Sequence, residues 1–410
     1  MSLVALTVEK YKCFERRQTL ELRPITVLLG RNNSGKSALA RLPLLLETGL
    51  RTDSEAPLER ENLGIELAGD FTDLIFGQRP HGSVTFGLHF DAAEIEATVQ
   101  NIDEYQIQVI SEFRGSSRNG SDLHVTWNLD DPRRPTWSAS GSGRDAIDVT
   151  FRGLLPWPLQ NGNASKRRSL WTTIPNDYPL VRYVGPFREK PQRFYRLPSR
   201  APAAVGVLGE DAPHILADDV SRGDGSLLAA VDDYLRRELP GWLLDVDRRN
   251  SLYSLVLASG ADSTVRVNLA DTGTGLAQVL PILVQRTMDE LRPPSRPVLE
   301  IIEQPELHLH PAAHAALADL YIAGTAQNRC RFLIETHSET FVLRLRRRVA
   351  EGRISPDQIA LYYVEHDGSS ADIRRIDLDD LGNVQNWPAG IFSEDFEEAR
   401  ALVAAQSERA

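Results

Sequence analysis

The sequence predicts an α/β fold with a mixed sheet flanked by helices, and three observations lead to this prediction. An apolar run at 25–29, "ITVLL", precedes the segment "GRNNSGKS" at 30–37, and a run of helical character begins at about Lys36. Later in the chain, the short apolar runs "VLEII", "RFLIE" and "ALYYV" are typical of buried parallel strands. Segments with apolar residues at helical spacing lie among these runs.

The first lobe is predicted to be rich in strands. Strand-like runs occupy 3–11, 83–90 and 105–113, the last two with the alternation of apolar and polar residues that strands have. The section 114–178 is rich in Ser, Gly, Asn, Asp and Pro, which indicates hairpins and loops inserted into this lobe.

The second half is predicted to be mainly helical before its last strands. We expect a helix within 212–240, a strand at 251–259 and a glycine-bearing turn at 271–275. A helix over 276–291 follows this turn, and Pro281 is expected to kink it.

The composition is that of a globular protein. The chain has 410 residues, of which 41% are hydrophobic and 25% are charged, and this length indicates about two to three lobes or one large domain with insertions. The net charge of −11 excludes a surface that is basic all over, so contact with nucleic acid would need a local patch.

The cysteines and the apolar runs indicate the cellular compartment of the protein. Cys13 and Cys330 lie far apart and match no metal-ligand spacing, which is typical of a protein in a reducing compartment. No apolar run approaches the ~20 residues of a membrane span, and the N-terminal run is too short for a signal peptide. We therefore expect a cytoplasmic protein.

The segment "GRNNSGKS" fits the pattern G-x-x-x-x-G-K-[ST] between a strand and a helix. Glycines in this loop let backbone N–H groups turn toward the phosphates, the lysine reaches the β and γ oxygens, and the serine hydroxyl can ligate magnesium. We therefore predict that ATP and Mg²⁺ bind here. The predicted nucleotide-binding residues are Gly30, Arg31, Asn32, Asn33, Ser34, Gly35, Lys36, Ser37 and Ala38.

Two later strands end in candidate site residues. The strand 298–302 delivers Glu303, a carboxylate that can hold magnesium through water across from Ser37. The strand 331–335 ends in "ETHS", so His337 is expected to hydrogen-bond the γ-phosphate. A single histidine of this kind is more often an ordinary turn residue, but its order after the other motifs favours the nucleotide site.

Taken in order, the motifs "TVEKYKCF", "GRNNSGKSAL", "DTGTGLAQVLPIL", "IIEQPELHLHP" and "IETHSE" resemble the ABC-type ATPases of the SMC, RecF and OLD group. More closely, they resemble the bacterial AAA-type ATP-binding proteins of that group, many of them encoded in defence loci. The resemblance covers about 1–95 and 255–375, and it is weak between them. It implies a P-loop NTPase fold of the ABC/SMC-head type, with a β-rich and helical insertion between the phosphate loop and the signature turn.

The resemblance also implies a division of the chain. Residues 1–110 and 256–375 would form the two parts of the ATPase head, and residues 111–255 the inserted region. Residues 376–410 would form an acidic tail, which we interpret as a docking element for a partner protein.

In the family that the chain resembles, two heads sandwich two ATP molecules. The resemblance implies that a signature turn of Thr272, Gly273, Thr274 and Gly275 contacts the γ-phosphate of the partner's ATP, although the usual signature serine is absent. It also implies that Gln78 reaches magnesium and the attacking water. The alternative for Gln78 is an ordinary polar loop residue.

The residue after the magnesium carboxylate is unusual. Most ABC-type heads have a second carboxylate there, whereas this chain has Gln304, whose amide can orient water but cannot accept its proton. Loss of a general base lowers a rate by about 10²–10⁴. Glu306 is the available substitute, although it could instead serve the dimer contact with His308 and His310. We expect slow ATP hydrolysis, with Glu306, Gln304 and His337 as the catalytic residues.

These features predict an ATPase that forms a homodimer or a higher oligomer when it binds ATP. We expect it to act as the sensor or regulator of a larger assembly, in bacterial antiphage defence, with a separately encoded effector. The alternative is a DNA-repair or DNA-clamping ATPase like RecF and the SMC proteins. Its DNA contact would be the arginines of 344–348, which are more commonly part of a solvated helix face.

Overall fold

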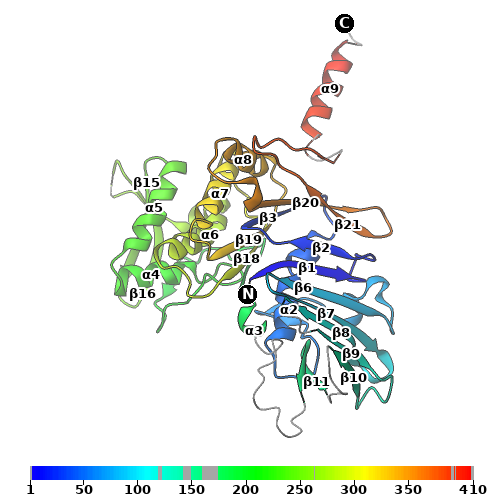
Figure 1. Cartoon of the computed structure of the whole chain (residues 1–410). Coiled ribbons are helices and arrows are strands. Elements are labelled where there is room, and N and C mark those ends of the chain that lie inside the picture. The colour runs from blue at the N-terminus through cyan, green and yellow to red at the C-terminus, as the bar shows by residue number, and fades with distance from the viewer. Residues whose placement is uncertain are drawn as a thin grey trace.

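The structure is a computed structural model, and it describes residues 2–118, 122–141, 149–158, 174–262, 264–388, 392 and 394–407. Figure 1 shows a central sheet with helices on one side, a large antiparallel sheet beside it, and a separate lobe of helices and strands. The C-terminal helix α9 (Glu394–Ser407) projects from the body. In the described part of the chain, no helix is long and apolar enough to cross a membrane.

The central sheet carries the predicted phosphate loop. Within the described residues it has six strands, joined in parallel except for the antiparallel pair β20 and β21. β18, which ends at Glu303, is not adjacent to β3, which precedes the phosphate loop, because β19 lies between the two strands. The spatial order is β13 (Leu180–Val184), β18 (Val298–Glu303), β19 (Cys330–Glu335), β3 (Ile25–Leu29), β20 (Ile359–His366) and β21 (Ala371–Ile376).

Both faces of this sheet are buried, as expected for parallel strands with continuous apolar sequences. Alternate side chains enter two different cores: Val27 packs in one core and Leu28 in the other. One face meets α6 (Thr274–Leu291), α7 (Pro311–Gly324) and α8 (Glu339–Ala350). The other meets α1 (Lys36–Ala40), α2 (Leu42–Leu50) and the antiparallel sheet.

The antiparallel sheet confirms the strands predicted at 83–90 and 105–113, and it contains β7, which was not predicted. The predicted division at residue 111 falls within β8, in the middle of this sheet. In spatial order the strands are β10 (Trp137–Gly141), β9 (Leu123–Trp127), β8 (Ile107–Ser117), β7 (Ala93–Ile102), β6 (Ser83–Phe90), β1 (Leu3–Glu9) and β2 (Gln18–Glu21). A separate hairpin pairs β11 (Val149–Arg152) with β12 (Leu155–Pro158).

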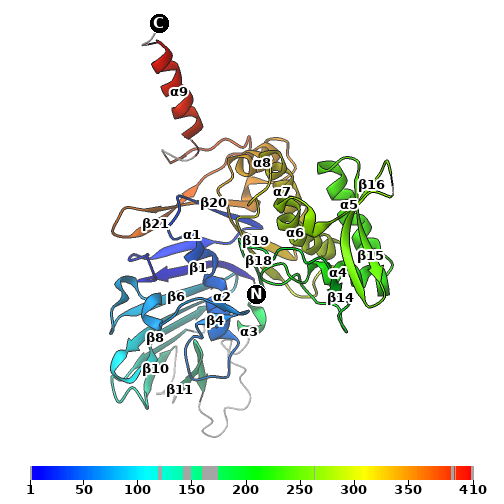
Figure 2. The ribbon, with the colours of Figure 1, turned by 180° about the vertical axis from the view of Figure 1, so that it is seen from behind.

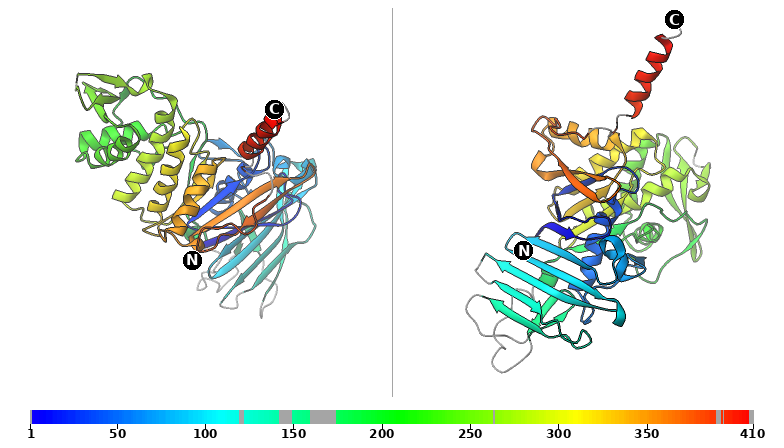
Figure 3. Two further views of the ribbon diagram at one scale, coloured as in Figure 1. Left: turned by 90° about the horizontal axis from the view of Figure 1, so that it is seen from above. Right: turned by 90° about the vertical axis from the view of Figure 1, so that its right-hand side faces the viewer.

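The third lobe packs against α6, on the side of the molecule away from the antiparallel sheet (Figures 1 and 3). The segment 212–240, predicted to be helical, forms two helices, because the chain turns at Gly223 and Gly225, and Gly225 has a positive φ of 76°. The predicted boundary at residue 255 falls inside a strand. The elements are α4 (Ala212–Arg222), α5 (Ser226–Glu238), β14 (Tyr195–Arg196), β15 (Trp242–Arg249), β16 (Leu252–Ser259) and β17 (Arg266–Asn268).

Short elements complete the described chain. They are β4 (Glu61–Asn62), β5 (Ile65–Glu66), α3 (Ile174–Asp177) and the 3₁₀ turns at Phe71–Leu74, Phe76–Gln78, Asp103–Tyr105, Leu269–Asp271 and Pro356–Gln358.

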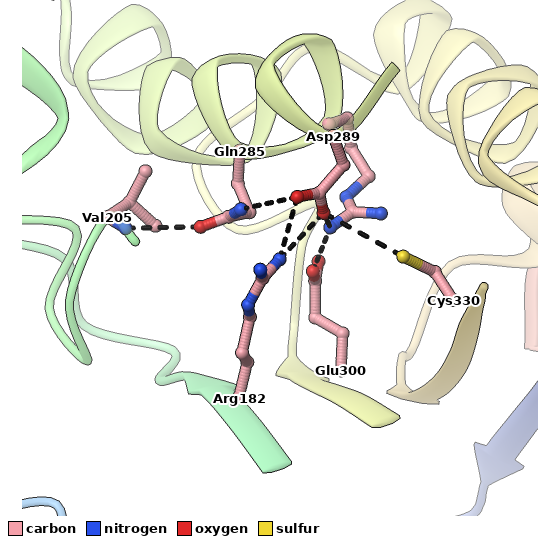
Figure 4. A network of polar contacts seen from close by, with 7 residues as sticks. Arg182, Val205, Gln285, Asp289, Glu300 and Cys330 are labelled. Atoms are coloured by element: carbon pink, nitrogen blue, oxygen red, sulfur yellow. Dashed lines mark hydrogen bonds and ion pairs between the residues drawn. The ribbon is translucent and has the colours of Figure 1, made fainter. Parts of the chain in front are cut away.

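A buried network of charges joins α6 to the central sheet (Figure 4). Asp289 of α6 accepts hydrogen bonds from Arg182 of β13, at 2.7 and 2.9 Å, and from Arg286, one turn earlier on the same helix. Arg286 also pairs with Glu300 of β18, and both side chains are only 1% exposed. Burial raises the pKa of Glu300, and the charge of Arg286 opposes this shift. The helix that begins at the signature turn is thus tied directly to the strand that ends at Glu303.

Candidate nucleotide and magnesium site

The phosphate loop has the conformation that its two glycines permit. Gly30 and Gly35 have positive φ values of 148° and 106°. A Cβ at Gly30 would overlap the carbonyl oxygen of Val364, and one at Gly35 would lie 2.5 Å from Cys13 Sγ. Only glycine fits both positions without strain, so the loop curves tightly before α1. This curvature points backbone N–H groups toward a bound phosphate.

Lys36 lies under this loop, at the start of α1. Its side chain is 3% exposed, and its ammonium group donates a hydrogen bond of 2.6 Å to the carbonyl oxygen of Arg31. Burial lowers the pKa of Lys36, and the nearby Glu335 opposes this shift. The lysine is therefore held at the inner side of the loop, where the predicted phosphates would lie.

Glu335, at the end of β19, is the carboxylate that contacts the phosphate loop. One of its oxygens accepts a hydrogen bond of 2.8 Å from Ser37 Oγ, and the other lies 3.9 Å from Lys36 Nζ. Burial, together with the charge of Glu303, raises the pKa of Glu335 to about 6. The sequence analysis did not select this residue, although the signal was present in the motif "ETHS".

Glu303 ends β18 next to Glu335, and the two residues are register partners in adjacent parallel strands. Its two carboxylate oxygens accept hydrogen bonds of 2.6 and 2.7 Å from the guanidinium of Arg41. That guanidinium also lies 5.7 Å from the centre of the Tyr183 ring. In this structure Glu303 pairs with Arg41, and Ser37 pairs with Glu335. The role of Glu303 as a magnesium ligand stays a prediction.

The turn after β18 brings Glu306 and His337 together. One oxygen of Glu306 accepts a hydrogen bond of 2.7 Å from the backbone N–H of His337. The exposed imidazole of His337 has a lowered pKa, through partial desolvation and the charge of Lys36. Gln304 has a positive φ of 47°, and its N–H donates to the carbonyl oxygen of Glu335 at 2.7 Å. The three predicted catalytic residues thus lie on two connected turns.

Arg188 contacts the backbone of the turn after β18, and the sequence analysis did not assign it to the site. Its guanidinium is buried and donates hydrogen bonds to the carbonyl oxygens of Glu303, at 3.1 Å, and Gln304, at 3.4 Å. Burial lowers its pKa. Its own carbonyl oxygen accepts a hydrogen bond of 3.3 Å from the Gln278 amide, so α6 and the turn are connected through Arg188.

The predicted signature turn lies at the exposed N-terminus of α6. Gly273 is the N-cap residue, and no side chain caps the helix there. A Cβ at Gly275 would lie 2.9 Å from the carbonyl oxygen of His308, so this turn packs against the turn that follows β18. Thr272 Oγ1 donates to the carbonyl oxygen of Leu269 at 2.7 Å. Exposed N–H groups at a helix N-terminus are suited to bind an anion.

Gln78 is exposed and has a positive φ of 50°. Its side-chain amide donates a hydrogen bond of 2.9 Å to Asp73. Among the described residues, no hydrogen bond joins Gln78 to Ser37 or Glu303. Its role as a magnesium and water ligand stays a prediction.

The arginines of α8 have partners within the chain. Arg344 and Arg348 both donate to Asp319 of α7. Arg347 pairs with Glu351, and Arg346 donates to the carbonyl oxygen of Gly382. These contacts favour a solvated helix face over a surface reserved for nucleic acid.

The residues of the site fit magnesium and a nucleotide. Magnesium prefers oxygen ligands, and Ser37 and Glu335 supply a hydroxyl and a carboxylate side by side. Ser34 Oγ and Glu306 Oε2 are buried without a hydrogen-bond partner among the described residues, so both can still accept one from a ligand or water. In the same part of the chain, no three His, Cys, Asp or Glu side chains are grouped to hold a metal ion alone. A magnesium ion here would thus also need phosphate oxygens or water.

Two family models match parts of the chain. Residues 233–342 match a model described as "AAA ATPase domain", and residues 354–402 match one described as "Protein of unknown function (DUF3696)". Comparison with curated proteins gives no match. The region matched as an ATPase domain contains the signature turn, β18 with its following turn, and His337.

Comparison with solved structures gives matches at low sequence identity. One is the SMC head bound to the C-winged helix domain of ScpA, with 11% identity, a TM-score of 0.46, and coverage of 92% of this chain and 98% of that chain. The SMC head domain from Thermotoga maritima has 12% identity, a TM-score of 0.39, and coverage of 92% and 100%. An SMC head from Pyrococcus furiosus, bound to the C-terminal domain of ScpA, has 10% identity, a TM-score of 0.47, and coverage of 92% and 96%.

The phosphate loop between β3 and α1, the parallel strands of the central sheet and the matched ATPase region define the class of protein, an α/β fold of the P-loop ATPase type. The match to the AAA ATPase model covers residues 233–342 alone, so the likeness to the SMC and RecF proteins stays a resemblance.

Proposed function

We propose that this protein is an ATP-dependent switch, which binds ATP with Mg²⁺, closes as a pair of heads and hydrolyses the ATP slowly. The observation that carries the proposal is a phosphate loop next to Glu335 and Glu306, with Gln304 where a general base is expected. When bound, magnesium would neutralise charge on the phosphates. Phosphate binding, orientation of the attacking water and contact between the heads would be performed by side chains and backbone groups of the protein.

Nucleotide binding is supported by the ordered conformation of the phosphate loop and of Lys36 within it. Lys36 is buried and already directed to the inner side of the loop, so little ordering is left for the ligand to cause. Lys36 would bind the β- and γ-phosphate oxygens, and Ser37 would ligate the magnesium ion. His337, whose lowered pKa favours the neutral imidazole, would donate to the γ-phosphate.

Slow turnover is supported by the two residues closest to the general-base role. The Gln304 amide can orient a water molecule but cannot take its proton. Glu306 has a free buried oxygen that can take this proton, but its other oxygen is bonded to the His337 N–H. A base constrained in this way would accept the proton less readily than a carboxylate at position 304. A well-placed general base at that position would raise the rate of hydrolysis by about 10²–10⁴-fold.

Closure of two heads is supported by the exposed N-terminus of α6. Thr272, Gly273, Thr274 and Gly275 would meet the γ-phosphate of the ATP held by the partner, as in the family that the chain resembles. The network of Arg182, Arg286, Asp289 and Glu300 would transmit this contact to β18. Each head would then respond to the nucleotide of the other.

The biological setting rests on the resemblance to proteins encoded in defence loci. We place the switch in the bacterial cytoplasm, in antiphage defence, with a separate effector that responds to the closed dimer. The projecting helix α9 is the element that we assign to docking of that effector. The second candidate, a DNA-clamping ATPase, is disfavoured by the internal ion pairs of the α8 arginines.

The test combines ATP turnover with molecular mass in solution, measured with MgATP. The wild type is expected to dimerise only with ATP and to hydrolyse it slowly. Lys36→Ala should abolish ATP binding and dimerisation, Glu306→Gln should abolish turnover while the dimer remains, and Gln304→Glu should raise turnover by about 10²-fold or more.

Three results would contradict the proposal. They are turnover at the same rate in wild type and Gln304→Glu, full turnover in Glu306→Gln, or a mass that does not change with ATP. A titration with labelled duplex DNA at two salt concentrations separates the second candidate, because binding through phosphates weakens steeply with salt.

A further inference from the structure

We propose that the cavity between α5, α6 and α7 is a binding site for a small amphipathic anion, and that this ligand regulates the switch. The three helices are neighbours in Figure 1, and the cavity between them has a volume of about 570 Å³. Sites for small molecules typically measure about 300–1,000 Å³. The regulatory role rests on the proposed function, whereas the binding site itself does not.

The apolar lining of the cavity comes from one stripe of each helix. Larger aliphatic side chains of α6 form one wall, and α7 presents alanines opposite α5. Because alanine side chains are small, α7 does not fill the space between the helices, and an apolar ligand can. The residues are Leu276, Val279 and Leu283 of α6 and Ala312, Ala313 and Ala316 of α7.

The charge available to a ligand in this cavity is positive. Arg237 of α5 lines it, and its guanidinium lies 5.3 Å from the centre of the Tyr234 ring. Among the side chains that the structure describes, none forms an ion pair with Arg237. Asp319, a carboxylate of the cavity wall, is already engaged by Arg344 and Arg348. A ligand with an anionic group therefore gains a partner that the protein does not supply.

Two helix N-termini add potential of the same sign. Gly275 lies in the first turn of α6 and Ala312 in the first turn of α7, and both line the cavity. The N-terminus of a helix carries a partial positive charge. An apolar body with a single anionic group fits this combination, with the body against the aliphatic stripes and the anion toward Arg237.

The cavity also borders the two turns that the proposed closure uses. Gly275 belongs to the predicted signature turn, and His308 belongs to the turn after β18. These two turns pack against each other, since a Cβ at Gly275 would lie 2.9 Å from the carbonyl oxygen of His308. A ligand in the cavity would contact both turns. If it affects closure, it must bind the ATP-free and the ATP-bound chain with different affinities.

The first test measures the site on the full-length chain without nucleotide. The probe is anilinonaphthalene sulfonate, an aromatic anion that fluoresces in apolar sites, and phenylnaphthylamine is its uncharged counterpart. We expect one sulfonate molecule to bind per chain. Ala316→Phe fills the cavity and should abolish binding of both compounds. Arg237→Gln should weaken the sulfonate by about tenfold and the uncharged compound by less than about twofold, because a charged hydrogen bond is lost.

Matched variants control for changes outside the cavity. Arg236→Gln alters the neighbouring residue of α5, which pairs with Asp232 and does not line the cavity, so it should bind the sulfonate as the wild type does. Ala313→Phe fills the cavity from one turn earlier on α7, and it replaces Ala316→Phe if that variant does not fold.

Two results would overturn the binding site. One is sulfonate affinity that stays unchanged in the filled variant and in Arg237→Gln, which would place the probe elsewhere on the surface. The other is displacement of the sulfonate by a peptide of residues 394–407, which would assign the cavity to a helix such as α9 instead of a small molecule.

The second test measures regulation, by repeating the sulfonate titration with magnesium and a non-hydrolysable ATP analogue. The affinity should change by about fivefold or more in the wild type and stay constant in Lys36→Ala. Equal affinities in the wild type, with the analogue bound, would overturn the regulatory role. If the analogue does not bind at all, it is the proposed function that fails, and the first test still decides the binding site.

Discussion

Arg188 and Gln304 are joined by a contact that no sequence motif indicated: the buried guanidinium donates to the carbonyl oxygen of Gln304, and to that of Glu303 before it. The turn that carries Gln304 and Glu306 is therefore held through its backbone by a residue from a segment more than a hundred positions earlier. Its geometry depends on packing rather than on its own sequence.

Replacement of Arg188 by Lys should lower ATP turnover without weakening ATP binding. An ammonium cannot reach both carbonyl oxygens, so the turn would shift, and displacement of a catalytic group by about 1 Å can cost about 10²-fold in rate. Lys36 and the loop are not contacted by Arg188, so the Kd for ATP should stay within about twofold.

The measurement is single-turnover hydrolysis beside equilibrium binding of ATP. Arg196→Lys is the matched control, because Arg196 is exposed and lies on the same segment. A parallel loss of binding and turnover in Arg188→Lys would indicate general damage to the fold instead of a positioning role.

Replacement of Arg286 by Met should strongly destabilise the protein. The change leaves Glu300 buried without its cation, and removal of one partner from a buried pair typically costs about 3–5 kcal/mol. The free energy of unfolding in urea gives this cost directly. Arg347→Met is the control, since Arg347 is exposed and pairs with Glu351 on the surface, where a pair contributes about 0–1 kcal/mol. Equal effects of the two changes would be incompatible with a structural role for the network.

The pH dependence of stability should contain a contribution from Glu47 of α2. Burial raises the pKa of this carboxyl, against the opposing effects of Arg51 and Asn62. The folded state then retains a proton that the unfolded state has already released. The free energy of unfolding should therefore fall as the pH rises from 4.5, the ordinary pKa of a glutamate, through the raised pKa of Glu47. Above that raised pKa, Glu47 should contribute no further change with pH.

Glu47→Gln removes the titrating group and should make this decline less steep, measured as urea unfolding at a series of pH values. Glu55→Gln, at an exposed position, controls for the loss of one negative charge. A decline of unchanged slope in Glu47→Gln would rule out this origin.

Much of the fold could be predicted from local patterns. The strand 25–29, the phosphate loop and the following helix are encoded within about fifteen adjacent residues, where spacing and glycine positions determine the backbone. The same holds for the strands that end at Glu303 and Glu335, whose continuous apolar sequences suit a sheet buried on both faces. By contrast, β7 was not predicted, although its ten residues alternate between buried and more exposed positions as a strand does. The break between α4 and α5 was not predicted either, because glycines between two segments of helical spacing do not show by themselves where a helix ends.

By itself, the sequence determined that this protein has a phosphate loop, a carboxylate at the end of a later strand, an amide directly after it, and a histidine just after the next strand. Tertiary structure alone decided which charges meet: Arg41 with Glu303, Ser37 with Glu335, and Arg188 with the turn after β18. The physical reason is that a motif specifies residues a few positions apart, whereas ion pairs depend on the register of strands and the packing of helices. Those are set by contacts between segments far apart in the chain.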